Sequence, residues 1–222
     1  MSDKKLPKGF TVTWHTGAMD TPDNSLTFVK AAVKGKAKVT EFDVSFRPDG
    51  TPCVIHKDFP AEGEGESLDL MLAEAAKSKT MWLNLDLKNW ANLPAVEEML
   101  KKHGMMERAF YTGVSEKQCG VTAETSVLPY FLNDFAPVGK RREMDARALA
   151  AKIKKCGAVG LNTQFGGLSK TLVRVLHEEG LLVSAWTVDK PADQKKVLAM
   201  GVDNITTRRS DMMAETLKNA GK

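Results

Sequence analysis

Three acidic side chains lie in two short apolar segments, at positions that alternate with apolar residues. Glu41 and Asp43 are separated by one phenylalanine, and Asp86 lies between two leucines. Because every second side chain of a β-strand points to the same face, these carboxylates would lie opposite their apolar neighbours. Carboxylate oxygens are ligands that Mg²⁺ and Ca²⁺ prefer. The pattern is typical of a divalent-cation site, although Glu41 and Asp43 alone fit a solvated strand equally well.

Two of the four histidines follow apolar residues directly and precede a predicted turn. His15 ends the first apolar segment, and His56 ends a short apolar run further along the chain. Histidine exchanges a proton near neutral pH, so two histidines facing one another across a phosphate could act as general base and general acid. By contrast, His103 and His177 lie in the last turns of predicted helices, where the helix dipole favours a cation.

Lys88 and Trp186 are candidate ligand contacts. Lys88 shares one face of its segment with Asp86, and two charges of this kind are costly to bury in an inert core. At the mouth of a barrel the same two side chains could bind a ligand. Trp186 faces inward if Ser184 and Val188 do, and there it could form an apolar wall for the alcohol or acyl part of a ligand. Packing in the barrel core explains Trp186 equally well.

The elements that must position these residues alternate along the chain. Strand periodicity predicts eight strands, with a further short run over Pro52 to His56 after the turn residues Asp49 and Gly50. The strands are expected at Phe10 to Thr16, Val39 to Phe46, Met81 to Lys88, Arg108 to Thr112, Ser126 to Leu132, Ala158 to Asn162, Leu182 to Val188 and Asn204 to Thr207. Helices are expected at Ser25 to Lys34, Leu68 to Ala76, Pro94 to Lys102, Asp145 to Lys155, Ser169 to Glu178, Ala192 to Met200 and Met212 to Asn219, with a short one within Ser115 to Thr125.

Eight strands that alternate with helices predict a parallel sheet closed into a (β/α)8 barrel. The length of 222 residues fits one such barrel with short loops, so residues 1–222 are expected to form a single compact domain. Function in this fold lies at the carboxyl ends of the strands. A doubly wound α/β binding module is the alternative fold, but it would leave His56 without a role.

Charge, cysteines and hydropathy set limits on partners and compartment. The net charge of +4 is spread along the chain, which does not argue for nucleic acid, and the basic run at 140–142 is expected to be a solvated loop. Three cysteines without CxxC spacing predict neither a disulfide framework nor a zinc site. No apolar run approaches the roughly 20 residues of a membrane span. A cytoplasmic protein is therefore expected, or a secreted one if the natural protein has a signal peptide that this sequence does not include.

In order and spacing, several motifs resemble those of the glycerophosphodiester phosphodiesterase family. They are His15-Thr-Gly, Pro22-Asp-Asn-Ser25, Glu41-Phe-Asp43, the segment from Asp49-Gly to His56, Leu85-Asp-Leu-Lys88, Ala185-Trp-Thr-Val188 and Gly201-Val-Asp-Asn-Ile-Thr206. The resemblance implies a (β/α)8 barrel that hydrolyses phosphodiesters with a divalent cation, Mg²⁺ or Ca²⁺. The small-molecule partner it implies is a glycerophosphodiester or a related diester derived from a phospholipid.

The resemblance also implies roles for individual residues. The implied metal ligands are Glu41, Asp43 and Asp86, the implied acid/base pair is His15 and His56, and Lys88 is the implied phosphate contact. Only residues 57–79 separate the second histidine from the next predicted strand. The substrate-binding region that the family commonly inserts there is therefore expected to be absent.

Two departures from the family pattern keep other activities open. Thr16 and Asp86 stand where the family usually has arginine and glutamate. Aspartate followed by Leu-Lys is similar to the sphingomyelinase D relatives on the same barrel, so a reaction that forms a cyclic phosphate is one alternative. A barrel that binds phosphoryl groups or metal with impaired turnover is another. The sequence does not predict an oligomeric state.

Overall fold

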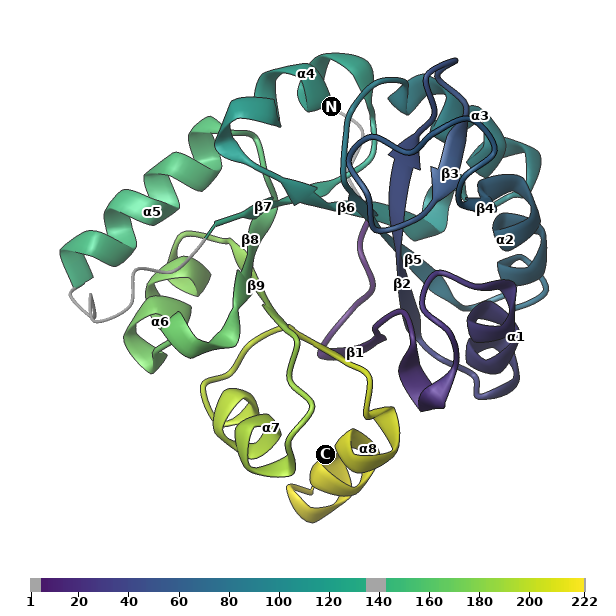
Figure 1. Cartoon of the computed structure of the whole chain (residues 1–222). Helices are drawn as coiled ribbons and strands as arrows, with labels where there is room; N and C mark the ends of the chain where they lie inside the picture. Colours follow the sequence, from purple (N-terminus) through teal and green to yellow (C-terminus); the bar gives the residue numbers. More distant parts are fainter. Residues whose placement is uncertain (1–4, 135–142, 222) are drawn as a thin grey trace.

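The computed structural model describes residues 5–134 and 143–221, and within them eight parallel strands form a closed ring (Figure 1). The ring strands are β1 (Thr11–Trp14), β2 (Val39–Phe46), β5 (Trp82–Leu87), β6 (Ala109–Val114), β7 (Tyr130–Asn133), β8 (Gly160–Gln164), β9 (Leu182–Trp186) and β10 (Asn204–Thr207). They pair in chain order, and β1 closes the ring by pairing with both β2 and β10. The predicted (β/α)8 barrel is confirmed.

Helices surround the ring on its outer side, one after each strand of the barrel (Figure 1). They are α1 (Leu26–Lys34), α2 (Leu68–Ala75), α3 (Leu93–Lys102), α4 (Cys119–Thr125), α5 (Glu143–Lys155), α6 (Lys170–Glu178), α7 (Pro191–Leu198) and α8 (Ser210–Asn219). The side chains of Ser67 and Ser169 accept hydrogen bonds from the backbone N–H groups three residues on, as N-caps do. In the described part of the chain, no helix has the length and apolar character of a membrane span.

A short antiparallel extension continues β2 beyond the ring. β3 (Pro52–Val54) pairs with the end of β2, and β4 (Glu66–Ser67) pairs with β3. Between His56 and the start of α2 the chain forms only the rest of the β3–β4 loop and β4 itself, so no larger inserted region is present there. The predicted absence of an insertion is thereby confirmed.

Alternation along the strands divides the apolar core from the barrel interior. On β5, Leu83, Leu85 and Leu87 are buried in the core between the strands and the helices. The interior has an apolar cluster of Val39, Phe110 and Phe131 and, beside it, a polar layer. In that layer the Asn204 Oδ1 atom accepts hydrogen bonds from the hydroxyls of Thr11 and Thr13, each at 2.8 Å. The amide of Asn204 donates to the Ser184 hydroxyl at 3.0 Å. Hydrogen-bonded polar groups therefore form the floor beneath the carboxyl ends of the strands.

Predicted strand boundaries differ from the observed ones by up to four residues, and the two largest differences at a strand start have a cause in capping contacts. The strand expected from Ser126 begins only at Tyr130, since the buried Glu97 carboxylate binds the Ser126 hydroxyl and accepts a hydrogen bond from the Val127 N–H at 3.0 Å. β8 begins two residues after Ala158, whose N–H bonds at 3.2 Å to a carbonyl at the end of α5. The basic run at 140–142 lies outside the described residues.

Candidate active site

A cavity of about 210 Å³ opens at the carboxyl ends of the barrel strands. All seven residues singled out from the sequence line it: His15, Glu41, Asp43, His56, Asp86, Lys88 and Trp186. Asn84, Thr112, Asn133, Asn162, Thr187 and Thr206 complete the lining. The barrel therefore brings together residues that are up to 191 positions apart in the sequence, His15 and Thr206.

The three carboxylates gather in one cluster on β2 and β5. One oxygen from each of Glu41, Asp43 and Asp86 lies within 4.8 Å of the others. Asp43 and Asp86 are direct register partners across the two strands, which sets their side chains next to one another. Glu41 and Asp43 are almost fully buried, so neither belongs to a solvated strand. Burial, together with the charges of Asp43 and Asp86, holds the pKa of Glu41 well above its usual value.

Lys88 lies between two of these carboxylates. Its ammonium is 2.9 Å from Asp43 Oδ1 and 2.5 Å from Asp86 Oδ2. Burial alone would lower the pKa of Lys88, but the two carboxylates raise it above its usual value. Burial alone would likewise raise the pKa of Asp43, but Lys88 and the Asn24 amide lower it. Both groups are therefore charged at neutral pH.

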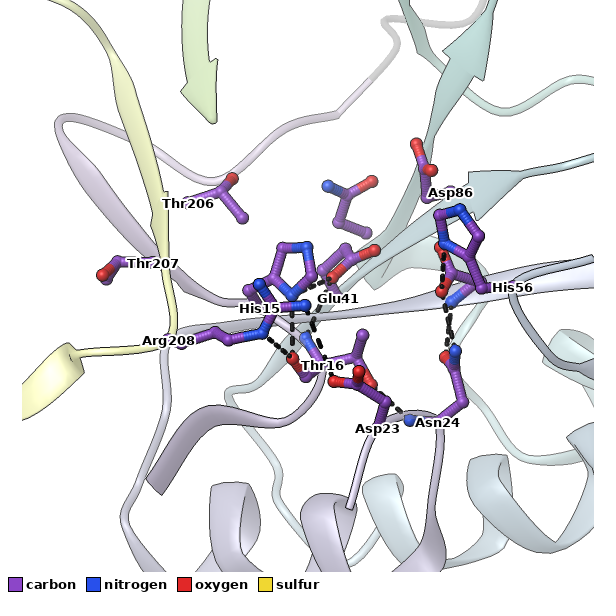
Figure 2. Close-up of polar contacts among 12 residues, drawn as sticks. His15, Thr16, Asp23, Asn24, Glu41, His56, Asp86, Thr206, Thr207 and Arg208 are labelled. Carbon is purple, nitrogen blue, oxygen red and sulfur yellow. Dashed lines mark hydrogen bonds and ion pairs between the residues drawn. The ribbon is translucent and has the colours of Figure 1, made fainter. Parts of the chain in front are cut away.

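Asn24 positions Asp43 through two hydrogen bonds, a role that sequence reasoning missed. Its amide donates to Asp43 Oδ2 at 2.7 Å, and its Oδ1 accepts from the Asp43 backbone N–H at 3.0 Å (Figure 2). Asn24 has a left-handed backbone conformation with φ 51°, which asparagine tolerates better than most residues. The motif Pro22 to Ser25 was the available signal, but it did not indicate which group the asparagine would hold.

His15 lies just beyond the end of β1 and is largely buried. Its Nδ1 is 2.7 Å from the Thr16 carbonyl oxygen, which can only accept a hydrogen bond. The Nδ1 atom therefore carries the proton, and in the neutral ring Nε2 is left with a free electron pair. Burial lowers the pKa of His15, and the charge of Arg208 lowers it further, although the bond to Thr16 opposes both effects. The Glu41 carboxylate lies 3.8 Å from Nδ1.

His56 lies on the other side of the carboxylate cluster, in the loop after β3. Its Nδ1 is 3.1 Å from Asp43 Oδ2, so a proton on this atom faces a carboxylate (Figure 2). The side chain is 75% exposed, which leaves Nε2 open to a ligand in the mouth of the barrel. The other two histidines lie at the ends of α3 and α6, where His103 pairs with Asp69 and His177 pairs with Asp203.

Neutral polar groups surround the acidic cluster and were also missed from the sequence. The Thr112 hydroxyl on β6 lies 2.6 Å from Asp86 Oδ1 and 2.8 Å from Asn84 Oδ1. Asn133 and Asn162 are joined side chain to side chain at 2.8 Å. Each follows the inward alternation of its strand, but a lone threonine or asparagine in a strand carries no distinctive sequence signal.

The cluster fits a hard divalent cation. Its donors are carboxylate oxygens from three neighbouring residues, and no cysteine lies among the residues that line the described cavity. The raised pKa of Glu41 reflects negative charges crowded together away from water. A cation among them would remove that repulsion. The burial of the carboxylates and the type of their donor atoms therefore both fit a divalent cation.

Comparison with known proteins identifies the group to which the chain is related. A family model described as the glycerophosphoryl diester phosphodiesterase family matches residues 92–212, which is more than half of the chain. The chain belongs to this family. Membership places it among the phosphoric diester hydrolases.

Individual relatives agree with this assignment. A glycerophosphodiester phosphodiesterase of Bacillus subtilis is 24% identical, over 92% of this chain and 85% of its own length. The crystal structure of a glycerophosphodiester phosphodiesterase from Parabacteroides distasonis superimposes with a TM-score of 0.76 at 20% identity, covering 96% of this chain and 99% of that one. An Oleispira antarctica phosphodiesterase, solved in complex with the product sn-glycerol-3-phosphate, superimposes with a TM-score of 0.78 at 17% identity, over 95% and 97%.

The family match and the cavity cover different parts of the chain. Six of the seven predicted site residues precede residue 92, and Trp186 alone lies within the matched range. Membership in the glycerophosphoryl diester phosphodiesterase family therefore rests on the second half of the barrel. The six residues of the first half line the cavity, and their contacts place them around one acidic cluster.

Proposed function

We propose that this chain hydrolyses a glycerophosphodiester, or a related diester derived from a phospholipid, to a phosphate monoester and an alcohol with the help of a divalent cation. One observation carries the proposal: two histidines flank a buried cluster of three carboxylates within a single cavity. A phosphodiester in that cavity would have a proton acceptor on one side and a proton donor on the other. Membership in a family of phosphodiesterases supports the same reaction class.

Glu41, Asp43 and Asp86 would hold the cation, either Mg²⁺ or Ca²⁺. When bound, it would neutralise charge on the non-bridging oxygens of the phosphate. Lys88 would contribute a second positive charge from the same side of the cavity, and its two carboxylate partners fix the position of its ammonium. Asn24 would keep Asp43 in position by holding both its side chain and its backbone.

His15 would act as the general base. Its Nδ1 proton is held by the Thr16 carbonyl, so the neutral ring offers only Nε2 as an acceptor. Burial lowers the pKa of the ring, which keeps it neutral at pH 7. In this role Nε2 takes a proton from a water molecule as the water oxygen attacks phosphorus.

His56 would act as the general acid. The Asp43 carboxylate accepts its Nδ1–H, so the charged ring has the Nε2 proton available for transfer. That proton would pass to the oxygen of the leaving alcohol as its bond to phosphorus breaks. The exposure of His56 fits this role, because the alcohol must leave through the mouth of the barrel.

Trp186 would form an apolar wall beside the alcohol or acyl part of the substrate. It lies at the carboxyl end of β9 and lines the cavity. The other residues that line the described cavity are polar or charged, so Trp186 is its one large apolar side chain. The cavity would therefore favour small or flexible alcohol groups over one particular headgroup.

The test is a panel of phosphodiesters incubated with Mg²⁺, Ca²⁺ or EDTA. The panel contains glycerophosphocholine, a lysophospholipid and sphingomyelin, and it is run on the wild type and on His15→Asn and His56→Asn. His177→Asn is the matched control, because that histidine lies on α6 and pairs with Asp203. Removal of a general acid or base costs typically 10² to 10⁴ in rate.

We expect hydrolysis of a glycerophosphodiester by the wild type and by the control, and at least a 10²-fold loss in the other two variants. Wild-type turnover by both variants would show that the acid/base assignment is wrong. If the final product is a cyclic phosphate, the nucleophile is a hydroxyl of the substrate and not water. No reaction on any member of the panel would favour a barrel that binds phosphoryl groups without turnover.

A further inference from the structure

Apart from the proton that His56 would carry and give up as general acid, the cavity lacks a positive charge for the phosphate once the acidic cluster is balanced. Lys88 is the only lysine or arginine that lines it within the part of the chain that the structure describes, and it is bound to Asp43 and Asp86. A divalent cation and Lys88 together carry three positive charges, the same number as the negative charges of the three carboxylates. A phosphodiester brings one further negative charge, and a partner for it must come from outside this set.

Arg208 lies beside His15, just outside the set of residues that line the cavity (Figure 2). It follows β10, and its Nε donates a hydrogen bond to the Thr16 carbonyl oxygen at 3.1 Å (Figure 2). The same oxygen accepts the Nδ1–H of His15 at 2.7 Å. One carbonyl group therefore fixes the guanidinium next to the imidazole that faces the cavity.

The backbone of Arg208, like its Nε, is fixed by a hydrogen bond. The N–H of Arg208 donates to Asp189 Oδ1 at 2.8 Å, and the carboxylate also accepts from the Thr207 hydroxyl at 3.0 Å. Gly17, with φ 77°, lies against the guanidinium, and a Cβ atom there would come within 3.4 Å of Arg208 Nε and 2.1 Å of Asp23 Oδ1. The 3.4 Å distance is an ordinary contact, so glycine at this position leaves room for the Asp23 carboxylate beside the guanidinium.

The two outer nitrogens of the guanidinium, Nη1 and Nη2, make no hydrogen bond within the described part of the chain. Nη2 is 3.6 Å from Asp23 Oδ1, too far for a hydrogen bond, and the two side chains are 40% and 60% exposed. Such an exposed pair contributes little to stability. Nη1 has no hydrogen-bond partner among the residues that the structure describes. A planar fork of N–H donors beside a catalytic site is suited to the oxygens of a phosphate.

We propose that Arg208 binds a non-bridging oxygen of the substrate phosphate through its outer N–H groups, on the His15 side of the cavity. The inference rests on the proposed function for the identity of the phosphate ligand. Arg208 would supply a permanent positive charge that does not depend on the proton of His56, and it would leave the Asp23 carboxylate for the phosphate when substrate enters.

The experiment measures binding of sn-glycerol 3-phosphate by calorimetry in the presence of Mg²⁺, together with kcat and KM on the best diester of the panel. The variants are Arg208→Gln and Arg208→Lys. The matched control is Arg209→Gln, because this adjacent arginine pairs instead with Asp211, at 2.8 Å. Mg²⁺ affinity in the absence of phosphate is measured for every variant.

We expect Arg208→Gln to weaken glycerol 3-phosphate binding and to raise KM by at least about tenfold, since two charge-assisted hydrogen bonds are lost. Arg208→Lys should lie between Gln and the wild type, because it keeps the charge but not the fork. Mg²⁺ affinity should stay within about twofold of the wild type, and Arg209→Gln should behave as the wild type throughout.

Phosphate affinity and KM within about twofold of the wild type in Arg208→Gln would overturn the inference. A fall in kcat with KM and phosphate affinity unchanged would also overturn it, because Arg208 would then only position the Thr16 loop. If the wild type hydrolyses no diester but binds glycerol 3-phosphate through Arg208, the proposed function fails and the inference stands. If the wild type hydrolyses diesters and Arg208→Gln does so equally well, the proposed function stands and the inference about Arg208 fails.

Discussion

Replacing Glu41 by glutamine should stabilise the metal-free protein and abolish its response to metal. The three carboxylates lie within 4.8 Å of one another, and at an effective dielectric constant of about 20 each ionised pair then repels by about 3 kcal/mol. Lys88 offsets part of this repulsion through Asp43 and Asp86. Glutamine at position 41 can still accept the hydrogen bond from the Thr16 N–H, now 3.0 Å long. We therefore expect a net gain of about 2 kcal/mol in the free energy of unfolding.

The gain should depend on pH in a defined direction. Burial and the neighbouring carboxylates raise the pKa of Glu41 above its usual value of 4.5, so folding favours the protonated carboxyl. That stability is fully present below the usual pKa and is lost as pH rises through the raised pKa of the folded state. Glu41→Gln should therefore match the wild type in acid and exceed it increasingly as the pH approaches neutrality.

Thermal unfolding in EDTA and in Mg²⁺ measures both effects. For a chain of this size about 2 kcal/mol corresponds to a rise in Tm of about 4 to 8 °C in EDTA. Saturating Mg²⁺ at 100 times its Kd should stabilise the wild type by about 2.7 kcal/mol and the variant by much less. Glu98→Gln, the same change on an exposed face of α3, should alter neither value. An Mg²⁺ response in Glu41→Gln equal to that of the wild type, without a gain in EDTA, would refute the reasoning.

Three further predictions concern neighbouring groups. Asn24→Gly keeps the left-handed backbone but removes both hydrogen bonds to Asp43. Calorimetry should therefore show Mg²⁺ affinity lowered by about 10-fold or more. An unchanged affinity would show that Asn24 does not position Asp43 for the cation. Burial lowers the pKa of His15 below 6.5, so the acid limb of kcat/KM in a pH–rate profile should have its midpoint below 6.5. A midpoint above 7 would contradict the assignment of His15 as the base. Asn204→Leu leaves the hydroxyls of the barrel floor without their shared partner, and urea unfolding should show a loss of about 2 to 4 kcal/mol, whereas a loss below 0.5 kcal/mol would contradict the importance of that network.

The ring of strands and the inward face of each strand were predictable because both follow from local periodicity. Alternation on β2 and β5 places Glu41, Asp43 and Asp86 on one face, and closure of the ring then brings them together. Strand periodicity is enough for this because the register of a buried strand admits no slip by one residue. The carboxylate cluster could therefore be predicted from spacing alone.

Contacts made across the ring could not be predicted in the same way. Arg208 bonds to Thr16 from 192 positions away, and its side chain lies beyond the last strand, where no periodicity applies. Asn24 reaches Asp43 from a loop whose backbone has a left-handed residue. The start of β7 depends on Glu97, a buried carboxylate of α3 that binds the loop before the strand. Each of these depends on where two distant segments meet in space.

The most direct test of the central claim is ³¹P nuclear magnetic resonance of glycerophosphocholine incubated with the purified chain. With Mg²⁺ or Ca²⁺ present, the diester resonance should disappear and a phosphate monoester resonance should take its place, while a sample in EDTA stays unchanged. Loss of this conversion in Glu41→Gln would link it to the carboxylate cluster. A diester resonance that persists with every cation tested, in a sample shown to be folded, would contradict the claim that this barrel is a metal-dependent phosphodiesterase acting on glycerophosphodiesters.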